Sequence, residues 1–483
     1  MKDWWPIILG VFEAVYIIST VLVAAKIITD TRTASKTLAY LLLIVILPFV
    51  GIVFYFTFGI SYRKNKFYDF KVERNQAIYE EVIRYINETN QRVLAENKEE
   101  LSSFKNTIML LANGTKSPAI GGNAVEILQN GEEKFERVFE VIRKAKHHIH
   151  LEYYIYDADE IGLELAELLK QKAREGVRVR FLYDALGSKL KKRFRKNMSE
   201  AGVEIKPVNE IRFRILANRI NYRDHRKIII VDGHEAFTGG INVSDKYINN
   251  GRGEVYWRDT HLYLKGPGVF YLQYLFLSNW VHTNEKLIGF DRAYVNNEEC
   301  PENKIVQIAA SGPDTKPAIM YSTVSAIHNA KERLYITTPY FIPPDPVLLA
   351  IKNAAWSGVD VRLIVPEVSD SKLVNAAAYS YFSELFDAGV RVYLYQKGFV
   401  HAKTMLVDDM VSQIGTANMD IRSHELNFEV NTFVYDKEIN NNLYNDFMHD
   451  LDDCIEINAQ EWAGRSKLKI FFEHLARLLS PLL

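Results

Sequence analysis

The apolar positions of this 483-residue chain are unevenly distributed, and two long apolar runs open it. The 22 residues from Trp4 to Ala25 carry a single charge, Glu13, and the 24 residues from Thr37 to Ile60 carry none. Each run reaches the roughly 20 helical residues that cross the hydrocarbon core of a bilayer. The pattern therefore predicts a transmembrane helical hairpin over residues 1–60, with Glu13 in the helix packing or facing a functional partner.

A cleaved signal peptide is the alternative for the first run, which ends in the small residues Ala24 and Ala25. The run is long for such a signal, and the residues before it are nearly neutral. The segment after the second run is more basic than the turn between the runs, and the positive-inside rule therefore favours a cytoplasmic body. The basic residues of that segment are Arg63, Lys64, Lys66, Lys71 and Arg74.

Beyond residue 117 the order of apolar and polar segments occurs twice. The strand-like run Ile149 to Tyr156 precedes a helical pattern and Gly176, and the run Leu334 to Ile342 precedes a helical pattern and Gly358. A valine-alternating strand follows each glycine, and the two glycines are 182 positions apart. Such repeats are typical of right-handed β-α-β crossovers. We expect an α/β fold with two pseudo-symmetric lobes, each a mixed sheet flanked by helices, packed face to face about a pseudo-two-fold axis.

The predicted organisation is a hairpin over 1–60, a helical linker over 61–117, a first lobe over 118–300 and a second lobe over 301–483. The second lobe ends in an amphipathic pattern with basic residues between the apolar ones. This pattern fits a helix at a membrane interface, or equally a helix packed against the body. Its apolar residues are Leu468, Phe471, Phe472, Leu475, Leu478, Leu479 and Leu482.

Composition narrows the possible functions. Hydrophobic residues make up 48% and charged residues 25% of the chain, which excludes wholesale disorder. Lys and Arg number 59 against 60 for Asp and Glu, so there is no global positive field to hold a nucleic acid. The two cysteines, Cys300 and Cys454, are too far apart in sequence for a disulfide framework or a paired metal site, and we expect free thiols.

The chemistry-bearing signal is a motif, H-x-K-x-x-x-x-D, that occurs once near the end of each repeat. The first copy has His225, Lys227 and Asp232, and the second has His401, Lys403 and Asp408. A glycine follows each aspartate by seven positions, and Asn242 or Asn418 follows that glycine by three. Because two copies share these offsets within a duplicated fold, coincidence is improbable.

Each residue type in the motif suits chemistry on a phosphodiester. Alternate side chains of a strand share a face, so the His and Lys of each copy point the same way. The two aspartates have the opposite parity and fall at strand ends, where we expect structural hydrogen-bond acceptors. Two ammonium groups can offset the negative charge that grows at phosphorus. Histidine has a large neutral fraction at pH 7 and can attack phosphorus without a metal.

With these motifs the chain resembles the phospholipase D superfamily, and specifically its bacterial cardiolipin synthases, over nearly its whole length. The resemblance extends to the hairpin segment 48–51 and to segments 146–154, 257–261 and 426–429. It departs at Gly240, where many members carry Ser or Thr, as this chain does at Thr416. That departure removes a hydroxyl that could contact the phosphate.

The resemblance implies phospholipase D-like lobes, His225 as a nucleophile that forms a phosphohistidine, and His401 as the general acid and base. We expect Asp259 to hold the second ring nitrogen of His225 and Glu429 that of His401. Asn242 and Asn418 would donate amide hydrogen bonds to phosphate oxygens.

No metal or other cofactor is expected, because the family chemistry is metal-free. A metal at the cluster His147, His148 and His150 is the alternative on this point.

The implied function is cardiolipin synthesis: one phosphatidylglycerol gives its phosphatidyl group to another, and glycerol leaves. The implied partners are phosphatidylglycerol and membrane lipids, without nucleic acid, in a bacterial cell membrane crossed by several spans. The oligomeric state is left open. The alternatives are a phospholipase D-type hydrolase that releases phosphatidic acid, a nuclease, and a catalytically inactive lipid-binding scaffold.

Overall fold

The computed structural model describes residues 4–30, 34–56, 76–209, 222–249, 255–284, 292–313 and 315–480. The chain divides into an N-terminal unit, residues 1–66 with 211–222, and a body, residues 67–210 with 223–483. The basic cluster Arg63, Lys64, Lys66, Lys71 and Arg74 lies outside the described residues.

The N-terminal unit contains one helix that is long and apolar enough to cross a bilayer. This helix, α1 (Trp5–Asp30), has a mean hydropathy of 2.0 over Gly10–Asp30, the only such span among the described residues. The second apolar run differs from the single helix expected, because it divides into α2 (Ala34–Ile46) and α3 (Pro48–Phe54). Proline lacks an N–H and disfavours helical backbone at the residue before it, which accounts for the break at Leu47. At 13 residues, α2 is about 20 Å long, short of the hydrocarbon thickness of about 30 Å.

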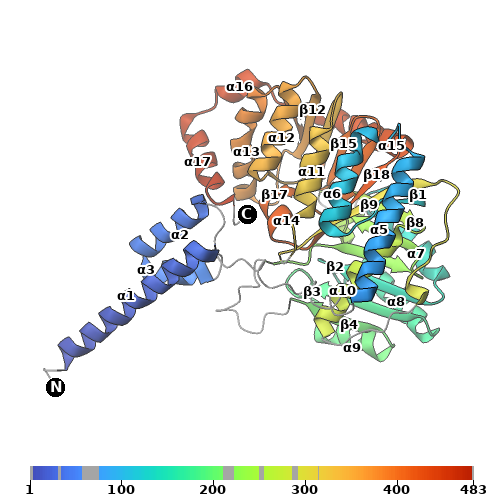
Figure 1. The fold of residues 1–483 in the computed structure, drawn as a ribbon, viewed down its shortest axis with the longest axis horizontal. Helices are drawn as coiled ribbons and strands as arrows, with labels where there is room; N and C mark the ends of the chain where they lie inside the picture. Colours follow the sequence, from blue (N-terminus) through green and yellow to red (C-terminus); the bar gives the residue numbers. More distant parts are fainter. Residues whose placement is uncertain are drawn as a thin grey trace. The chain divides into compact units, whose positions relative to one another are not determined.

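In the described part of the body, fifteen strands form one continuous sheet (Figure 1). The first half runs in the order β1 (Ile120–Gln129), β8 (Thr260–Lys265), β6 (Glu235–Gly239), β5 (Lys227–Val231), β2 (His148–Tyr153), β3 (Arg178–Asp184) and β4 (Glu204–Val208). The second half repeats that order with β9 (Lys304–Ser311), β18 (Glu429–Tyr435), β16 (Val411–Gly415), β15 (Thr404–Val407), β10 (Arg333–Thr337), β12 (Asp360–Pro366) and β13 (Arg391–Tyr395), and β19 (Cys454–Glu456) is added at its edge.

The duplication is thus present in the fold, but the two halves meet differently from the prediction. They join edge to edge through the antiparallel pair β1 and β9, with an irregularity between Ile120 and Asn123. The expected face-to-face packing of two separate sheets is therefore wrong. Backbone hydrogen bonds between two strands can join sheets as well as side-chain packing can, and the sequence pattern does not distinguish the two arrangements.

Helices cover both faces of the sheet. On one face the first half packs under α7 (Asn130–Lys144), α8 (Glu160–Arg174) and α9 (Lys192–Glu200). The second half packs there under α6 (Lys105–Thr115), α11 (Ala318–His328), α12 (Asp345–Trp356) and α13 (Lys372–Asp387). On the other face, α10 (Val269–Asn284) and α15 (Lys437–Asp452) cover a core cluster that draws residues from both halves. This shared core makes the halves one folded body.

Local sequence accounts for these elements. The run Ile228 to Val231 is fully buried, as expected of a strand that is covered on both faces. The predicted glycine turns follow α8 and α12, where Gly176 (φ 94°) and Gly358 (φ 92°) adopt the left-handed conformation that favours glycine. In the expected linker, α5 (Gln76–Glu96) and α6 pack into the core of the second half through Val93 and Ile108.

Candidate active site

The two motifs enter the site where each half of the chain pairs with the other half. The His225 N–H donates to the Phe428 carbonyl at 2.9 Å, and the His401 N–H donates to the Arg258 carbonyl at 2.7 Å. Before His401, β14 (Gly398–Val400) pairs in parallel with β7 (Tyr256–Arg258). Each histidine is therefore held beside the segment of the other half that leads to a buried carboxylate.

As a result of this pairing between the halves, each histidine contacts a carboxylate from the opposite half of the chain. His225 Nδ1 lies 2.9 Å from Glu429 Oε1 and 3.0 Å from Oε2. His401 Nδ1 lies 2.7 Å from Asp259 Oδ2. The expected pairing, Asp259 with His225 and Glu429 with His401, is therefore wrong. Proximity in sequence suggested partners within one half, whereas the backbone pairs just described bring each carboxylate to the opposite histidine.

The two carboxylates have different surroundings. The Thr416 hydroxyl donates to Glu429 Oε2 at 2.5 Å, and the Asn427 amide donates to Oε1 at 3.2 Å. Burial opposes ionisation, but the His225 ring, Lys227 and the Thr416 hydroxyl together hold the pKa of Glu429 below its usual value. Glu429 is thus an ionised acceptor for His225.

Among the described residues, Asp259 accepts no hydroxyl of this kind, because Gly240 occupies the place that Thr416 has in the other half. A Cβ at Gly240 would lie 2.0 Å from Asp259 Oδ1, so only glycine leaves room for the carboxylate. Burial raises the pKa of Asp259 to about 6, against the lowering effects of Lys403 and the Thr260 N–H. The departure from the family motif at Gly240 thus makes space for Asp259, and the matching hydroxyl of Thr416 contacts a carboxylate.

The two lysines are buried in the same site. Burial lowers the pKa of Lys227 to about 8 and that of Lys403 to about 7, although Glu429 and Asp259 oppose both shifts. Each Nζ donates to the carbonyl of its own histidine, Lys227 to His225 at 2.7 Å and Lys403 to His401. The charge of Lys227 also acts on the pKa of Lys403. The structure thus brings both motifs together, as the sequence predicts.

The histidine rings are nearly enclosed, and an aromatic side chain lies beside each of them. Burial is the main cause that lowers the pKa of both His225 and His401, which favours neutral imidazoles. The side chains of His225 and His401 are 12% and 10% exposed, respectively, so a narrow approach remains. The Tyr154 ring lies 4.9 Å from the His225 ring between centroids, and the Trp257 ring lies 5.4 Å from that of His401.

The sequence did not single out these aromatic neighbours individually, although Tyr154 and Trp257 fall inside segments that resemble the family. Trp257 could also have been identified from its position, because it lies two residues before the candidate carboxylate Asp259. Phe399, two positions before His401, packs on both, with ring centroids 4.9 Å from Trp257 and 5.8 Å from His401. Together these rings form an apolar wall beside the second histidine.

The motif aspartates lie at the far ends of the motif strands. From Lys227, the strand β5 takes Asp232 about 17 Å away. Asp232 accepts backbone N–H groups from Lys146, His147 and His148 at 2.8–3.0 Å. Asp408 does the same for residues 331–333 at 2.8–3.2 Å. Both adopt a left-handed backbone, with φ of 53° and 50°. This geometry ties the start of one strand to the end of its neighbour.

The asparagines each have a protein partner. Asn242 Nδ2 donates to the Tyr247 hydroxyl at 2.7 Å, and its Oδ1 accepts the Ile155 N–H at 3.1 Å. Asn418 Nδ2 donates to Asp420 Oδ2 at 3.0 Å. Within the described part of the chain, each side chain donates one amide hydrogen and keeps the other without a partner.

The histidine cluster at the start of β2 lies under α10, where a glutamine contacts the rings of His148 and His150. His148 Nε2 lies 2.9 Å from Gln273 Oε1, and His150 Nδ1 lies 2.9 Å from Gln273 Nε2. Among the described residues, no group of three His, Cys, Asp or Glu side chains could hold a metal ion. Cys300 and Cys454 are both free thiols.

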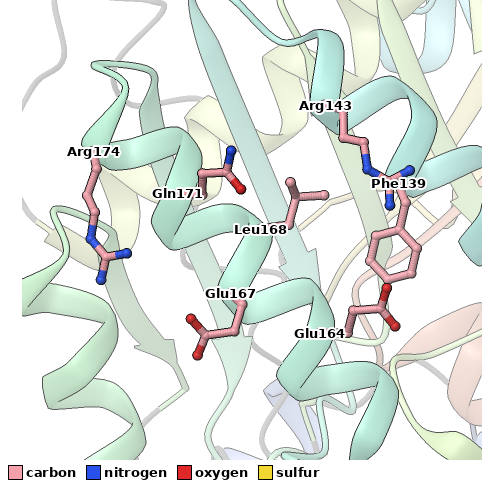
Figure 2. Close-up of a pocket in the computed structure, with 7 residues that line it drawn as sticks. All are labelled: Phe139, Arg143, Glu164, Glu167, Leu168, Gln171 and Arg174. Atoms are coloured by element: carbon pink, nitrogen blue, oxygen red, sulfur yellow. The ribbon is translucent and has the colours of Figure 1, made fainter.

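A surface recess of about 380 Å³ between α7 and α8 contains none of the motif residues (Figure 2). Phe139 and Leu168 form its apolar floor, and Arg143, Glu164, Glu167, Gln171 and Arg174 surround them. Because the lining is mostly charged and lies on the outer face of the first half, we do not assign the recess to the site.

Two family models match parts of this chain. Residues 138–259 and 323–451 match a family model described as the cardiolipin synthase PLD-like domain. Residues 18–59 match the phospholipase D-nuclease N-terminal model. The body also shares its fold with the crystal structure of phosphatidylserine synthase from Haemophilus influenzae, which has a TM-score of 0.61 at 17% identity and covers 78% of this chain and 100% of that one.

Curated relatives match nearly the full length. A cardiolipin synthase of Halalkalibacterium halodurans is 40% identical, over 99% of this chain and 95% of its own length. Cardiolipin synthase 2 of Bacillus anthracis is 40% identical, over 97% of this chain and 91% of its own. The two domain matches fall on the two halves that supply the crossed pairs, and the chain accordingly belongs to the cardiolipin synthase family of phospholipase D-like enzymes.

Proposed function

We propose that this protein transfers a phosphatidyl group from one phosphatidylglycerol to another and so makes cardiolipin and glycerol. The observation that carries the proposal is the pair of enclosed imidazoles, each with Nδ1 on a carboxylate and Nε2 left for chemistry. Two buried lysines beside them supply positive charge in a site of low dielectric. This arrangement suits a double displacement at a phosphodiester.

In the first step, His225 Nε2 attacks phosphorus and a phosphohistidine forms as the P–O bond to glycerol breaks. The imidazole gains positive charge as the N–P bond forms, and Glu429 stabilises that charge through Nδ1–H. Lys227 and Lys403 offset the charge on the phosphoryl oxygens, and the spare amide hydrogens of Asn242 and Asn418 donate to those oxygens.

His401 acts as the general acid and then as the general base. The anionic phosphodiester favours the protonated imidazole, and Nε2–H gives its proton to the departing glycerol oxygen. The neutral ring then takes the proton of the incoming glycerol hydroxyl, which attacks phosphorus and breaks the N–P bond. One phosphodiester replaces another, and both histidines return to their starting state, so the exchange consumes no cofactor.

The rival reaction uses water in the second step and releases phosphatidic acid. Purified full-length protein in vesicles with labelled phosphatidylglycerol separates the two outcomes. We expect cardiolipin and glycerol in equal amounts, whereas phosphatidic acid without cardiolipin would overturn the proposal. His225→Ala and His401→Ala should abolish turnover. His449→Ala, at a side chain that is 79% exposed on α15, is the matched control and should not change it.

We further propose that the protein resides in a bacterial cell membrane as a multi-pass protein with its body in the cytoplasm. The support is α1, the exposed apolar side chains of α2 such as Leu42, and the basic residues of segment 63–74 in the sequence. Reporter fusions placed after Ile60 test the orientation, and extracytoplasmic activity of the reporter would contradict it.

A further inference from the structure

The helix α17 (Lys467–Arg477) belongs to the body, and with the turn after it the helix exposes several large apolar side chains close together. A surface helix of a soluble domain ordinarily turns such residues inward. Here six large apolar side chains are between 41% and 74% exposed: Leu468, Phe471, Phe472, Leu475, Leu478 and Leu479.

The side of α17 that faces the body is polar and held by ion pairs. Glu473 is 3% exposed and pairs with Arg465 at 2.9 Å, and Arg477 pairs with Glu384 of α13 at 2.7 Å. The Arg477 guanidinium also lies 4.0 Å from the centre of the Tyr381 ring. The helices α13 and α17 lie side by side in Figure 1. The orientation of α17 is therefore fixed by specific contacts.

Helical geometry places the two sides in opposition. At about 100° per residue, the six apolar residues fall within an arc of about 120°. Glu473, Ala476 and Ser480, all buried, centre about 130° away from the middle of that arc. The usual relation of an amphipathic helix to its protein is thus inverted, and the apolar stripe faces away from the body.

The charges of α17 favour one kind of partner. Its only acidic residue, Glu473, is buried against Arg465, whereas Lys467, at the edge of the apolar stripe, and Lys469, in the first turn, are exposed. Phenylalanine and leucine on one side with exposed lysines at the flank are typical of helices that lie in the interface of an anionic bilayer. We propose that α17 inserts its apolar face into the surface of an anionic membrane and gives the body its own lipid contact, apart from the N-terminal helices.

The insertion depth of α17 can be measured on the full-length chain. A nitroxide at Leu475→Cys, in a Cys300→Ser and Cys454→Ser background, is placed in vesicles of phosphatidylglycerol and phosphatidylethanolamine. Collisions with oxygen should exceed those with a water-soluble nickel chelate, at a depth of about 5–10 Å below the headgroups. A control label at His449→Cys lies on the opposite face of the sheet and should favour the nickel chelate.

Two other results would overturn the proposal. Equal nickel access at both labels would leave the α17 stripe in water. If the label at position 475 were shielded from both oxygen and the nickel chelate, the stripe would be covered by protein. Dipolar broadening between labels would then identify that protein as a second copy of this chain. The depth is measured without turnover, so a correct depth in a chain that makes no cardiolipin would remove only the proposed function.

A paired substitution tests the stripe itself. Because Phe471 and Phe472 are 61% and 55% exposed, Phe471→Ser with Phe472→Ser should leave the melting temperature in detergent unchanged. The label at position 475 should then lose its oxygen preference, whereas Phe472→Leu should keep it. A melting temperature that falls sharply would show that the stripe packs within the protein, and the proposal would be wrong.

Discussion

Replacing Gly240 by alanine should disable the second histidine through its carboxylate. The new Cβ would lie 2.0 Å from Asp259 Oδ1, whereas real Cβ atoms stay at least 3.0 Å from such neighbours. The carboxylate must therefore retreat by about 1 Å or more. That movement stretches the 2.7 Å contact between Asp259 Oδ2 and His401 Nδ1. Because Gly240 has no left-handed φ, the effect is steric and involves no backbone strain.

The expected loss follows from that displacement. Misplacing a catalytic group by about 1 Å can cost about 100-fold in rate, or about 2.7 kcal/mol of activation free energy. A charge-assisted hydrogen bond is worth about 1.5–3 kcal/mol, which gives the same order of magnitude. We therefore expect the kcat for phosphatidylglycerol to fall about 100-fold in Gly240→Ala. The control is Gly114→Ala on α6, where nothing lies within 4 Å of the new Cβ.

The assay compares two leaving groups. Glycerol leaves only with a proton from His401, whereas p-nitrophenolate leaves without one. Gly240→Ala should therefore release p-nitrophenol from an activated phosphatidyl analogue at nearly the native first-turnover rate. Native turnover of phosphatidylglycerol by the variant would refute the steric argument. An equal loss on both substrates would refute the assignment of Asp259 to the histidine that acts as the acid.

Three further predictions concern other contacts. Thr416→Val removes the hydroxyl that donates to Glu429 and should lower turnover roughly 10- to 100-fold with either leaving group, as measured in the same assay. Asp408→Ala leaves three backbone N–H groups without their acceptor and should lower the free energy of unfolding by about 3 kcal/mol, while the folded fraction keeps its activity. Asp408→Asn tolerates the left-handed backbone and should lose less in chemical denaturation. Burial lowers the pKa of His148 to about 4. Between about pH 6.5 and 4 this imidazole is therefore protonated in the unfolded chain and neutral in the folded chain. The free energy of unfolding should fall by about 3 kcal/mol over that range. His148→Gln should flatten the dependence of melting temperature on pH in that window, and an unchanged slope would exclude this histidine as the cause.

Much of the fold could be predicted because its signals are local. The runs that became β2 and β10, and the turns at Gly176 and Gly358, follow from alternation and from left-handed glycine. The joining of the halves through β1 and β9 could not be predicted, since it depends on which strand edges meet in space. The break of the second apolar run before Pro48 was open to prediction from the rules for proline, but hydropathy alone concealed it.

The candidate site divides in the same way. Both motifs were found from residue type and spacing, both carboxylates were found through the family resemblance, and the aspartates were correctly expected at strand ends as acceptors. The partners of the carboxylates were not found, because Asp259 lies nearer in sequence to His225 than to His401. A periodic pattern in the sequence does not show that a segment of one half pairs with a segment of the other half. The contact of Trp257 with His401 likewise depends on that pairing, whereas Tyr154 and His225 belong to the same half.

The crossed pairs make each motif depend on the opposite half of the chain, and the leaving-group comparison therefore tests the crossing as well. With crossed pairs, Gly240→Ala in the first half impairs His401 and spares the attack by His225, so an activated leaving group restores the first step. With partners inside each half, the same substitution would disturb His225, and no leaving group could replace the lost nucleophile. Thr416→Val must then show the opposite pattern in the two cases. The pair of outcomes shows which carboxylate serves the nucleophile and which serves the acid, and the contacts of His225 with Glu429 and of His401 with Asp259 then give each histidine its role.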